Sequence, residues 1–377
     1  MADKIIYLDN AATTVVNEEV LEAYSKAKKL YFANPSSIHI PGQEASRLLE
    51  KAREQILQTL KVKNDELVFV SGATEANNLA IKGYCLKHQN RGKHIIVSNV
   101  EHPSVLEVAK QLKEYFGFEV TYLQVNNNGI IEIEDLKKAI RKDTILVSIM
   151  AVNNEIGTVN PIHDIAMLLK DYPLIVFHSD VTQGIGKIDL PYDDIDMFSF
   201  SGHKIHGLNS SGALVKRKKI ELLPLLSGGG QENGVRSGTN DVALAVSLAK
   251  AIRLEFEKIV ENYRKIAPIS QYFKDYLLSH QDLYELNSGD NPYIINFSLL
   301  TKKASVVVEA LSARGIMVSS VSACHAKEEP ISYVIQALGK NDLKAHNTIR
   351  VSLAGSNTLD DIKALIENLE SIIGGLK

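Results

Sequence analysis

The feature that most constrains the fold is a regular alternation of short apolar runs and longer amphipathic stretches between about residues 66 and 215. Each apolar run ends at small or polar residues, which is typical of a buried strand. The stretches between the runs have helical periodicity, for example 75–86, 104–116 and 162–170. This order predicts an α/β protein with a largely parallel sheet and helices on both faces. The expected strands are 67–70, 94–98, 120–125, 145–149, 174–178, 197–200 and 213–215.

Both flanks of the alternating region have a different pattern. Asn17 precedes an expected helix that continues to about Tyr31, and a second helix is expected at 43–60. A long helix at about 242–264 follows a glycine-rich stretch and connects to a C-terminal part with fewer strands. We therefore predict a large domain at 15–255 and a smaller α+β domain made of 1–14 and 256–377, against which the N-terminal run packs. The expected C-terminal elements are 294–297, 305–314, 331–338, 349–353 and 359–373.

The composition argues against several classes of protein. Lys and Arg total 42 against 45 for Asp and Glu, a formal net charge of −3, so no broad basic field favours direct binding of nucleic acid or of an anionic membrane. No apolar stretch approaches membrane-spanning length, and the start lacks a signal-peptide core. The two cysteines are too few for a disulfide framework, and no metal-spaced cluster is present. We expect a cytoplasmic protein.

Lys204 is the most unusual of the residues that follow an expected strand. It ends an apolar run that stops at Ser201, Gly202 and His203. Desolvation at such a place lowers the pKa of an ammonium group, which makes the neutral amine available to form a Schiff base. The alternative is a lysine that extends to solvent from a strand end, and this stretch alone favours that alternative.

Three other strand ends carry groups that would suit the same ligand. The turn 71–75 offers free backbone N–H groups, including that of Ala73, and the Thr74 hydroxyl to a phosphate. His102 can stack on a flat ring, and Asp180 needs a positive partner such as a protonated pyridine nitrogen. Gln183 could bond a phenolate oxygen. Each group alone has an ordinary structural explanation, as a turn, a structural histidine or a helix cap. A lysine, an acid, a stacking ring and a phosphate cup together are what pyridoxal phosphate requires.

Over nearly its whole length the chain resembles the NifS/IscS-type cysteine desulfurases, which are fold-type-I pyridoxal-phosphate enzymes of the class-V aminotransferase family. The matching stretches are 7–14 (YLDNAATT), 71–78 (SGATEANN), 101–102 (EH), 152–157 (VNNEIG), 180–183 (DVTQ), 201–204 (SGHK), 228–232 (GGGQE), 236–239 (RSGT), 322–324 (SAC) and 349–352 (IRVS). The sequence departs from the usual family pattern just after Lys204, Cys324 and Arg350.

The resemblance implies a role for each matching residue. Lys204 would hold the cofactor, Asp180 its ring nitrogen and His102 its ring face, with Asn154 and Gln183 around the phenolate edge. Arg350, together with Asn154, would bind the substrate carboxylate. The phosphate would be bound by Ala73, Thr74, Ser201 and His203, and by Thr239 from the second subunit of a homodimer.

Cys324 separates the desulfurases from related enzymes. It lies in a run of small and polar residues, 318–327, which is typical of an exposed loop. A buried structural thiol is the alternative, and that alternative suits Cys85, which falls in a helical stretch, better. For Cys324 we favour the nucleophile, with its thiolate promoted by His325 or Lys327.

The resemblance thus implies an enzyme that removes sulfur from L-cysteine, gives L-alanine and leaves a persulfide on Cys324. Sulfur would then pass to an acceptor protein, which could be an iron–sulfur scaffold, a tRNA-thiolating enzyme or a thiamin-pathway carrier. The alternatives are another enzyme with this cofactor, such as a selenocysteine lyase or an aminotransferase. A non-catalytic scaffold, or a dinucleotide-binding oxidoreductase suggested by the glycines near Gly228, is a weaker alternative.

Overall fold

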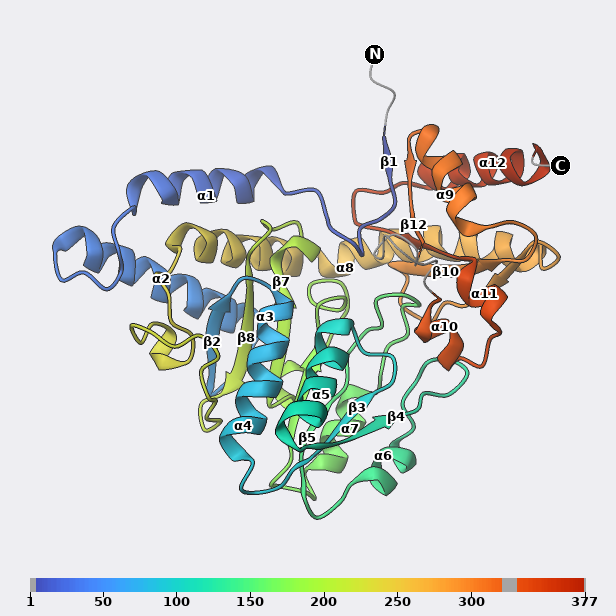
Figure 1. The fold of residues 1–377 in the computed structure, drawn as a ribbon. Coiled ribbons are helices and arrows are strands. Elements are labelled where there is room, and N and C mark those ends of the chain that lie inside the picture. The colour runs from blue at the N-terminus through green and yellow to red at the C-terminus, as the bar shows by residue number, and fades with distance from the viewer. Residues whose placement is uncertain (1–4, 321–330, 376–377) are drawn as a thin grey trace.

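A seven-stranded sheet forms the centre of the molecule, and the computed structural model describes it within residues 5–320 and 331–375 (Figure 1). The strand order is β2-β8-β7-β6-β5-β3-β4. Neighbours from β7 to β4 pair in parallel, whereas β8 is antiparallel to both β2 and β7. The predicted α/β class is therefore confirmed. The strands are β2 (Asp65–Val70), β3 (His94–Ser98), β4 (Glu119–Leu123), β5 (Thr144–Ser148), β6 (Val176–Asp180), β7 (Met197–Ser201) and β8 (Gly212–Arg217).

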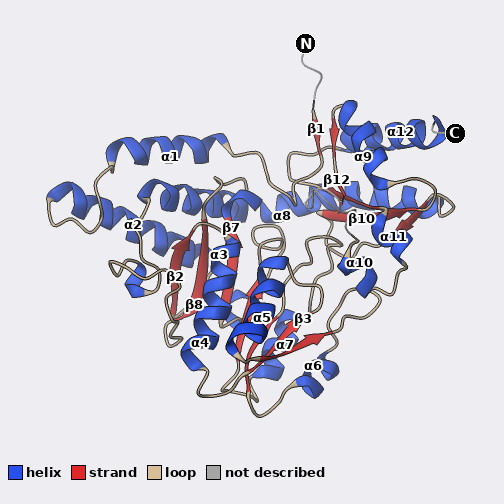
Figure 2. Cartoon of the chain, in the orientation of Figure 1, coloured by secondary structure: helices blue, strands red, loops and turns tan. Residues whose placement is uncertain are grey.

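Helices cover both faces of this sheet, as Figure 2 shows. Alternate strand residues face opposite ways, so Ile95 and Val97 enter one apolar cluster and Ile96 enters the other. The first cluster lies under α3 (Ala73–Asn78), α4 (Tyr84–His88) and α5 (Pro103–Phe116), and the π-helical turn η1 (Leu79–Gly83) joins α3 to α4. The second cluster lies under α2 (Ile40–Thr59), α7 (Ile162–Leu169) and the N-terminal half of α8 (Val242–Ser279). Burial on both faces explains why the strands are continuous apolar runs.

One strand begins later than its apolar run predicts. β6 covers Val176–Asp180 rather than 174–178, because Leu174 lies in a turn and is 66% exposed. As a result, Asp180 is the last residue of β6, whose final four residues are all buried, and does not follow the strand as predicted. The short elements α6 (Ile133–Ala139), η2 (Tyr192–Asp194) and η4 (Glu232–Gly234) were not predicted.

The helix α8 (Val242–Ser279) is 38 residues long and continues well past the predicted end at 264, through Pro268 (Figure 1). Its first half packs in the large cluster through residues such as Leu248 and Ile252. Its second half packs in a separate cluster through Ile266 and Phe273. Packing at both ends offsets the hydrogen bond that the proline removes, which helix propensity alone does not reveal.

The C-terminal part contains a four-stranded antiparallel sheet of order β12-β13-β10-β9. The N-terminal β1 (Ile6–Tyr7) pairs in parallel with β11 (Ile316–Met317), so the N-terminal apolar run packs against this part, as expected. This part has an apolar cluster of its own. The cluster supports the two domains that we propose, one at 15–255 and the other made of 1–14 and 256–377. The remaining strands are β9 (Tyr284–Leu286), β10 (Ile294–Leu299), β12 (Ser319–Ser320) and β13 (Thr348–Ser352), and the helices are α9 (Ala304–Ala313), α10 (Tyr333–Ala337), α11 (Asp342–His346) and α12 (Leu359–Gly375).

The first helix, α1 (Glu18–Leu30), begins as predicted. The Asn17 side chain accepts the backbone N–H of Glu19 at 2.8 Å, which caps the helix. The helix packs along α8. Within the described residues, no helix combines the length and the apolar character needed to cross a membrane.

Candidate active site

The carboxyl ends of β3, β5, β6 and β7 lie at one edge of the sheet, where open α/β sheets bind ligands. The chain that leaves β3 carries His102, and the chain that leaves β5 carries Asn154. Asp180 ends β6, and the turn η3 (Gly202–Lys204) directly follows β7. The topology therefore brings together side chains that are about a hundred residues apart in the sequence.

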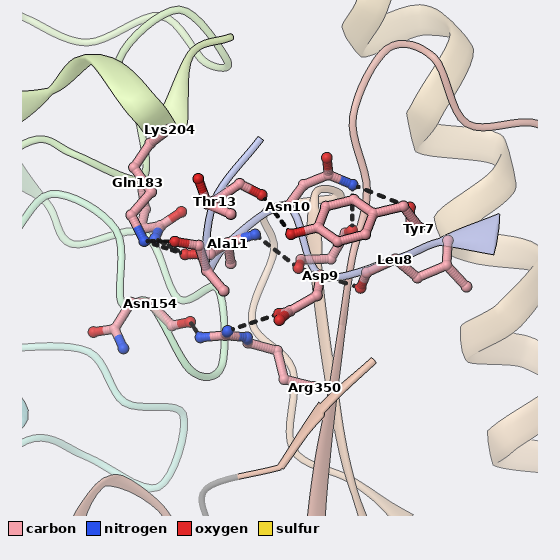
Figure 3. A network of polar contacts seen from close by, with 12 residues as sticks. Tyr7, Leu8, Asp9, Asn10, Ala11, Thr13, Asn154, Gln183, Lys204 and Arg350 are labelled. Carbon is pink, nitrogen blue, oxygen red and sulfur yellow. Dashed lines mark hydrogen bonds and ion pairs between the residues drawn. The ribbon is translucent and has the colours of Figure 1, made fainter. Parts of the chain in front are cut away.

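The Lys204 amine points at the N-terminal segment (Figure 3). Its Nζ donates to the carbonyl oxygens of Ala11 and Ala12, each at 2.6 Å. Burial lowers the pKa of Lys204 to about 7, and the nearby cations Arg350 and Lys187 contribute to this lowering. A neutral amine is therefore accessible near neutral pH, as a Schiff-base lysine requires.

Asp180 is buried and is held by neutral donors. Its Oδ2 accepts the Asn77 side-chain amide at 2.8 Å, and its Oδ1 accepts the Thr182 backbone N–H at 3.0 Å. No ion pair to Asp180 is present among the described residues, so the strongest positive partner of this carboxylate would have to come from a ligand. That arrangement suits an acid that faces a protonated ring nitrogen.

His102 belongs to a hydrogen-bond chain that leads to Asp180. Its Nδ1 accepts the Ser104 backbone N–H at 3.1 Å and lies 2.8 Å from the Ser104 hydroxyl. The Asn77 amide donates both to that hydroxyl, at 2.9 Å, and to Asp180. Because Nδ1 accepts, the proton of the neutral ring is assigned to Nε2. Burial lowers the pKa of His102, which favours that neutral ring.

The chain Asp180–Asn77–Ser104–His102 was not predicted. Asn77 and Ser104 lie inside or beside motifs that do resemble the family, but their spacing along the chain does not reveal that they contact each other. Only the packing of α3 against α5 brings them together. Asn77 and Ser104 are both buried polar residues, which are uncommon, but their burial is visible only in the structure.

The phosphate corner, which we define as Gly72–Thr74 and Ser201–His203, joins two strand ends. The Ala73 backbone N–H donates to the Ser201 hydroxyl at 2.7 Å. The backbone at the start of β8 approaches that of Gly72 closely, since a Cβ on Gly212 would lie 2.6 Å from the Gly72 Cα. Thr74 is exposed at the start of α3. His203 lies 3.2 Å from the Thr13 hydroxyl, and burial lowers its pKa to about 4, so its ring is neutral.

Thr239 lies on the surface beside the phosphate corner. It is exposed and lines a depression together with Ser71, Arg236 and Gly212. In the described chain no hydrogen bond joins Thr239 to Thr74 or Ser201. Its assignment to the phosphate of a second subunit stays a prediction.

Arg350 lies on β13 and faces the Lys204 edge (Figure 3). Its Nη1 donates to the Asn154 carbonyl at 2.9 Å, and its Nη2 donates to Asp9 Oδ1 at 3.0 Å. Its Nε and the Asn154 side-chain Oδ1 are both buried and have no hydrogen-bond partner among the residues that the structure describes. Unpartnered buried polar atoms on two neighbouring residues are a sign of a missing ligand. The contact with Asp9 was not predicted, although Asp9 lies in a matching motif.

Gln183 is buried beside the same lysine. Its Nε2 donates to the Ala11 carbonyl at 3.0 Å, and its Oε1 accepts Lys187 Nζ at 3.3 Å. The Ala11 carbonyl is therefore shared by Gln183 and Lys204 (Figure 3). Lys187 was not among the predicted site residues.

Cys324, the predicted nucleophile, lies outside the described residues. The chain on either side of 321–330 adjoins the site. Ser319 is the register partner of Arg350 in the β12–β13 pair, and the Ser332 hydroxyl donates to Glu155, next to Asn154, at 2.6 Å. Cys85 is fully buried and burial raises the pKa of its thiol, which confirms its interpretation as structural.

These residues fit pyridoxal phosphate. This cofactor needs an amine that can be neutral near pH 7, a buried carboxylate, a neutral imidazole and a close-packed turn that offers polar groups to a phosphate. Lys204, Asp180, His102 and the phosphate corner, where the Ala73 N–H and the Ser201 hydroxyl meet, supply these groups. The orphaned Asn154 and Arg350 atoms next to them suit an amino-acid substrate with a carboxylate.

The chain belongs to the aminotransferase class-V family, whose model matches residues 6–365, and this is a family of pyridoxal-phosphate-dependent enzymes. Within it, the relatives are the NifS/IscS-type cysteine desulfurases. Cysteine desulfurase IscS of Dictyoglomus turgidum is 41% identical over 99% of this chain and 95% of the relative. The solved structure of a NifS-like protein is 33% identical, with a TM-score of 0.92 over 99% of this chain and all of its own. A structure named SspA in complex with cysteine is 37% identical, with a TM-score of 0.79 over 92% and 98% of the two chains.

Proposed function

We propose that the chain is a cysteine desulfurase, which converts L-cysteine to L-alanine and leaves the sulfur as a persulfide on Cys324. The observation that carries this proposal is the pairing of Ser319 with Arg350. Ser319, which precedes Cys324 by five residues in the sequence, therefore lies opposite the arginine that would bind the substrate carboxylate. An aminotransferase has no use for a nucleophilic thiol.

The chain's own residues have separate tasks in this reaction. Arg350 binds the substrate carboxylate, and the bonds from its guanidinium to Asp9 and Asn154 fix its orientation. Lys204 would hold the cofactor and, as a neutral amine, take the proton from the substrate Cα. Asp180 would keep the ring nitrogen protonated, and His102 would lie on the ring face. When bound, pyridoxal phosphate supplies the electron sink for bond changes at the substrate carbons.

The sulfur step belongs to Cys324. Its thiolate attacks the substrate sulfur, a sulfur–sulfur bond forms and the bond from substrate sulfur to Cβ breaks. The electron pair of the broken bond passes to Cβ. A proton, equivalent to the one that the Cys324 thiol gave up to become a thiolate, adds to Cβ, which becomes the methyl group of alanine. The cysteine carbon is thus reduced and the enzyme sulfur is oxidised, so no external reductant enters until the persulfide is transferred.

Three further assignments belong to the same proposal. We place the enzyme in the cytoplasm, with an acceptor protein for iron–sulfur cluster assembly or for tRNA or cofactor thiolation. We also propose a homodimer in which Thr239 serves the partner's phosphate site. The exposure of Thr239, and of the apolar side chains Phe32, Ile38 and Ile40 on the same chain, supports that arrangement.

The test is a single-turnover reaction of the purified, cofactor-loaded protein with L-cysteine whose sulfur is radiolabelled. We expect one alanine per labelled Cys324, with the label retained on a non-reducing gel and released by a thiol. Alanine without labelled protein would contradict the thiol mechanism. Amino-group transfer to a keto acid would instead favour an aminotransferase, and activity restricted to selenocysteine would favour a selenocysteine lyase.

A further inference from the structure

Two lysine side chains in the described residues are buried, Lys187 and Lys216, and only one of them has a counter-ion. Lys216 Nζ lies 2.7 Å from Glu66 Oε2. Lys187 is 7% exposed, has no carboxylate within ion-pair distance among the described residues and donates only to Gln183 Oε1. A buried ammonium without a counter-ion is costly, so its retention calls for a reason beyond packing.

Lys187 begins a hydrogen-bond chain that ends at Lys204. Lys187 donates to Gln183 Oε1 at 3.3 Å, and Gln183 Nε2 donates to the Ala11 carbonyl at 3.0 Å. The same carbonyl accepts Lys204 Nζ at 2.6 Å. A lysine can only donate hydrogen bonds, whereas an amide offers an acceptor on one side and a donor on the other. Lys187 therefore selects the Gln183 orientation in which the NH₂ group faces the Lys204 side.

The local backbone delivers Lys187 to this place. Gly186 has φ +70°, and a Cβ there would lie 2.9 Å from the Glu255 Cβ on α8. The turn that follows Gln183 can thus pass against α8 only with a glycine at 186. It places Lys187 four residues after Gln183, on the same side of the turn.

The charges around the two lysines come from several elements. Lys187 faces Glu255 of α8, which attracts its charge, and Arg350 of β13, which repels it. The cations near Lys204 are Arg350 and Lys187, and the anions near it are Asp9 and Asp180. The neutral rings of His102 and His203 also lie near this lysine. Lys187 also depresses the pKa of His203. The positive charge of Lys187 thus opposes the attraction that the two carboxylates exert on the Lys204 ammonium.

We propose that Lys187 is a positioning residue of the cofactor site: it orients the Gln183 amide so that a donor faces the cofactor, and it holds a positive charge behind Lys204. The charge favours the neutral Lys204 amine, which is the form that captures an aldehyde. This inference rests on the proposed role of Lys204 and deepens it.

The test measures how fast the apoprotein captures pyridoxal phosphate as a function of pH. The capture rate rises as Lys204 loses its proton, so the midpoint, the pH at which the rate is half-maximal, reports the pKa of the Lys204 amine. We expect Lys187→Met, which keeps the side-chain length and removes the charge, to move the midpoint to higher pH. A midpoint that lies one pH unit higher means a capture rate about tenfold lower on the acidic side of the midpoint. The pH midpoint of the visible absorption of the loaded protein should move in the same direction.

Matched variants separate charge from orientation. Lys187→Gln removes the charge but keeps a donor, so it should displace the midpoint like Lys187→Met while it weakens cofactor affinity less. Lys187→Arg should restore the wild-type midpoint. Lys216→Met, at the buried lysine that has its own counter-ion, should leave the midpoint unchanged.

The outcomes distinguish this inference from the proposed function. Wild-type apoprotein that captures no cofactor at any pH would remove the proposed role of Lys204. Wild-type capture with an unchanged midpoint in Lys187→Met, or an equal displacement in Lys216→Met, overturns the role of the Lys187 charge. Equal cofactor affinity of the Met and Gln variants overturns its role in orienting Gln183. If Lys187→Met does not fold, an unchanged midpoint in Lys187→Gln is the overturning result.

Discussion

Arg350 and Asp9 form an ion pair between two segments that are 341 residues apart in the sequence, with 3.0 Å between Nη2 and Oδ1. Both side chains are largely buried, and the guanidinium is also tied to the Asn154 carbonyl. Burial raises the pKa of Asp9, and the adjacent guanidinium opposes that rise. The arginine is therefore held in position before any substrate arrives.

This geometry predicts the effect of Arg350→Gln. The variant loses the charged hydrogen bonds from the guanidinium to the substrate carboxylate, each of which contributes about 1.5–3 kcal/mol to binding. The KM for L-cysteine should therefore rise at least about tenfold. The cofactor should remain bound, but the pH midpoint of its visible absorption should move to higher pH, because Arg350 also lowers the pKa of Lys204. The matched control is Arg314→Gln, since the Arg314 side chain is exposed and, among the described residues, bonds only to Asn368. Cysteamine, which lacks the carboxylate, should be used equally by wild type and variant; a preserved preference for cysteine in the variant would refute the assignment.

Cys324→Ser tests the nucleophile. The variant should bind the cofactor with the wild-type visible spectrum, because no contact of the described site depends on Cys324. It should form no persulfide, since a hydroxyl cannot replace the thiolate as an acceptor of sulfur. Cys85→Ser is the control and should retain the labelled persulfide if it folds. Alanine production at the wild-type rate by Cys324→Ser would rule the mechanism out.

Lys204→Ala tests the covalent attachment. Without the amine the cofactor has no covalent link to the protein, so the visible absorption of the bound form should be lost after dialysis. Absorbance spectra and mass spectrometry after borohydride reduction measure this directly. An unchanged spectrum, or a reduced adduct on another lysine, would contradict the assignment.

Asn77→Leu tests the chain from Asp180 to His102. The substitution keeps the volume but removes the donor to Asp180 and to Ser104, which leaves two buried acceptors with fewer partners. We expect a loss of about 1–3 kcal/mol in the free energy of unfolding, measured with denaturant, together with a lower kcat. Asn78→Leu, at the next position, is the control, because within the described part of the chain the Asn78 amide bonds only to the Thr74 carbonyl. Full kcat in Asn77→Leu would mean that the chain does not position His102.

The pKa of Lys204 predicts how the stability of the apoprotein depends on pH. Its folded pKa is about 7 against an ordinary 10.5, so between these values the unfolded chain binds more protons. Its contribution to stability is complete above the ordinary value and is lost as the pH falls to about 7. The slope for one such group is at most about 1.4 kcal/mol per pH unit.

The measurement compares wild type with Lys204→Met in denaturant titrations from pH 7 to 9. Lys187, with a pKa of about 8, adds a slope of the same sign, while Glu101, whose pKa is raised to about 8 by burial, gives the opposite slope below pH 8. The difference between the two proteins isolates Lys204. Stability of wild type should rise more steeply with pH than that of the variant. Equal slopes would mean that Lys204 is not desolvated.

Much of the fold was predictable because buried strands and amphipathic helices leave a local pattern. The predicted strand at 94–98 coincides with β3, and the helix expected at 104–116 differs from α5 by a single residue. The misses were elements whose stability is not local. Two-residue strands such as β11 exist only through their partner, and the second half of α8 exists only through its packing.

The site shows the same division. Lys204, Asp180, His102, Ser201 and Arg350 could be named from their places after apolar runs and in matching motifs. The partners that set their orientation and charge could not: Asn77, Ser104, Asp9 and Lys187 all act through contacts between distant segments. Neither protonation nor orientation is a property of a residue type alone.

The sequence by itself determined the α/β class, the strand ends that carry the chemistry and the kind of cofactor that these residues suit. Those properties follow from short-range patterns of apolar and polar residues and from functional groups that do not depend on the fold. Only the tertiary structure decided that the Ala11 carbonyl accepts hydrogen bonds from both Gln183 and Lys204. It also decided that Lys187 donates to Gln183 and has no counter-ion among the described residues. Desolvation and Coulomb interactions depend on distances in space, and the chain sets those distances only when it is packed.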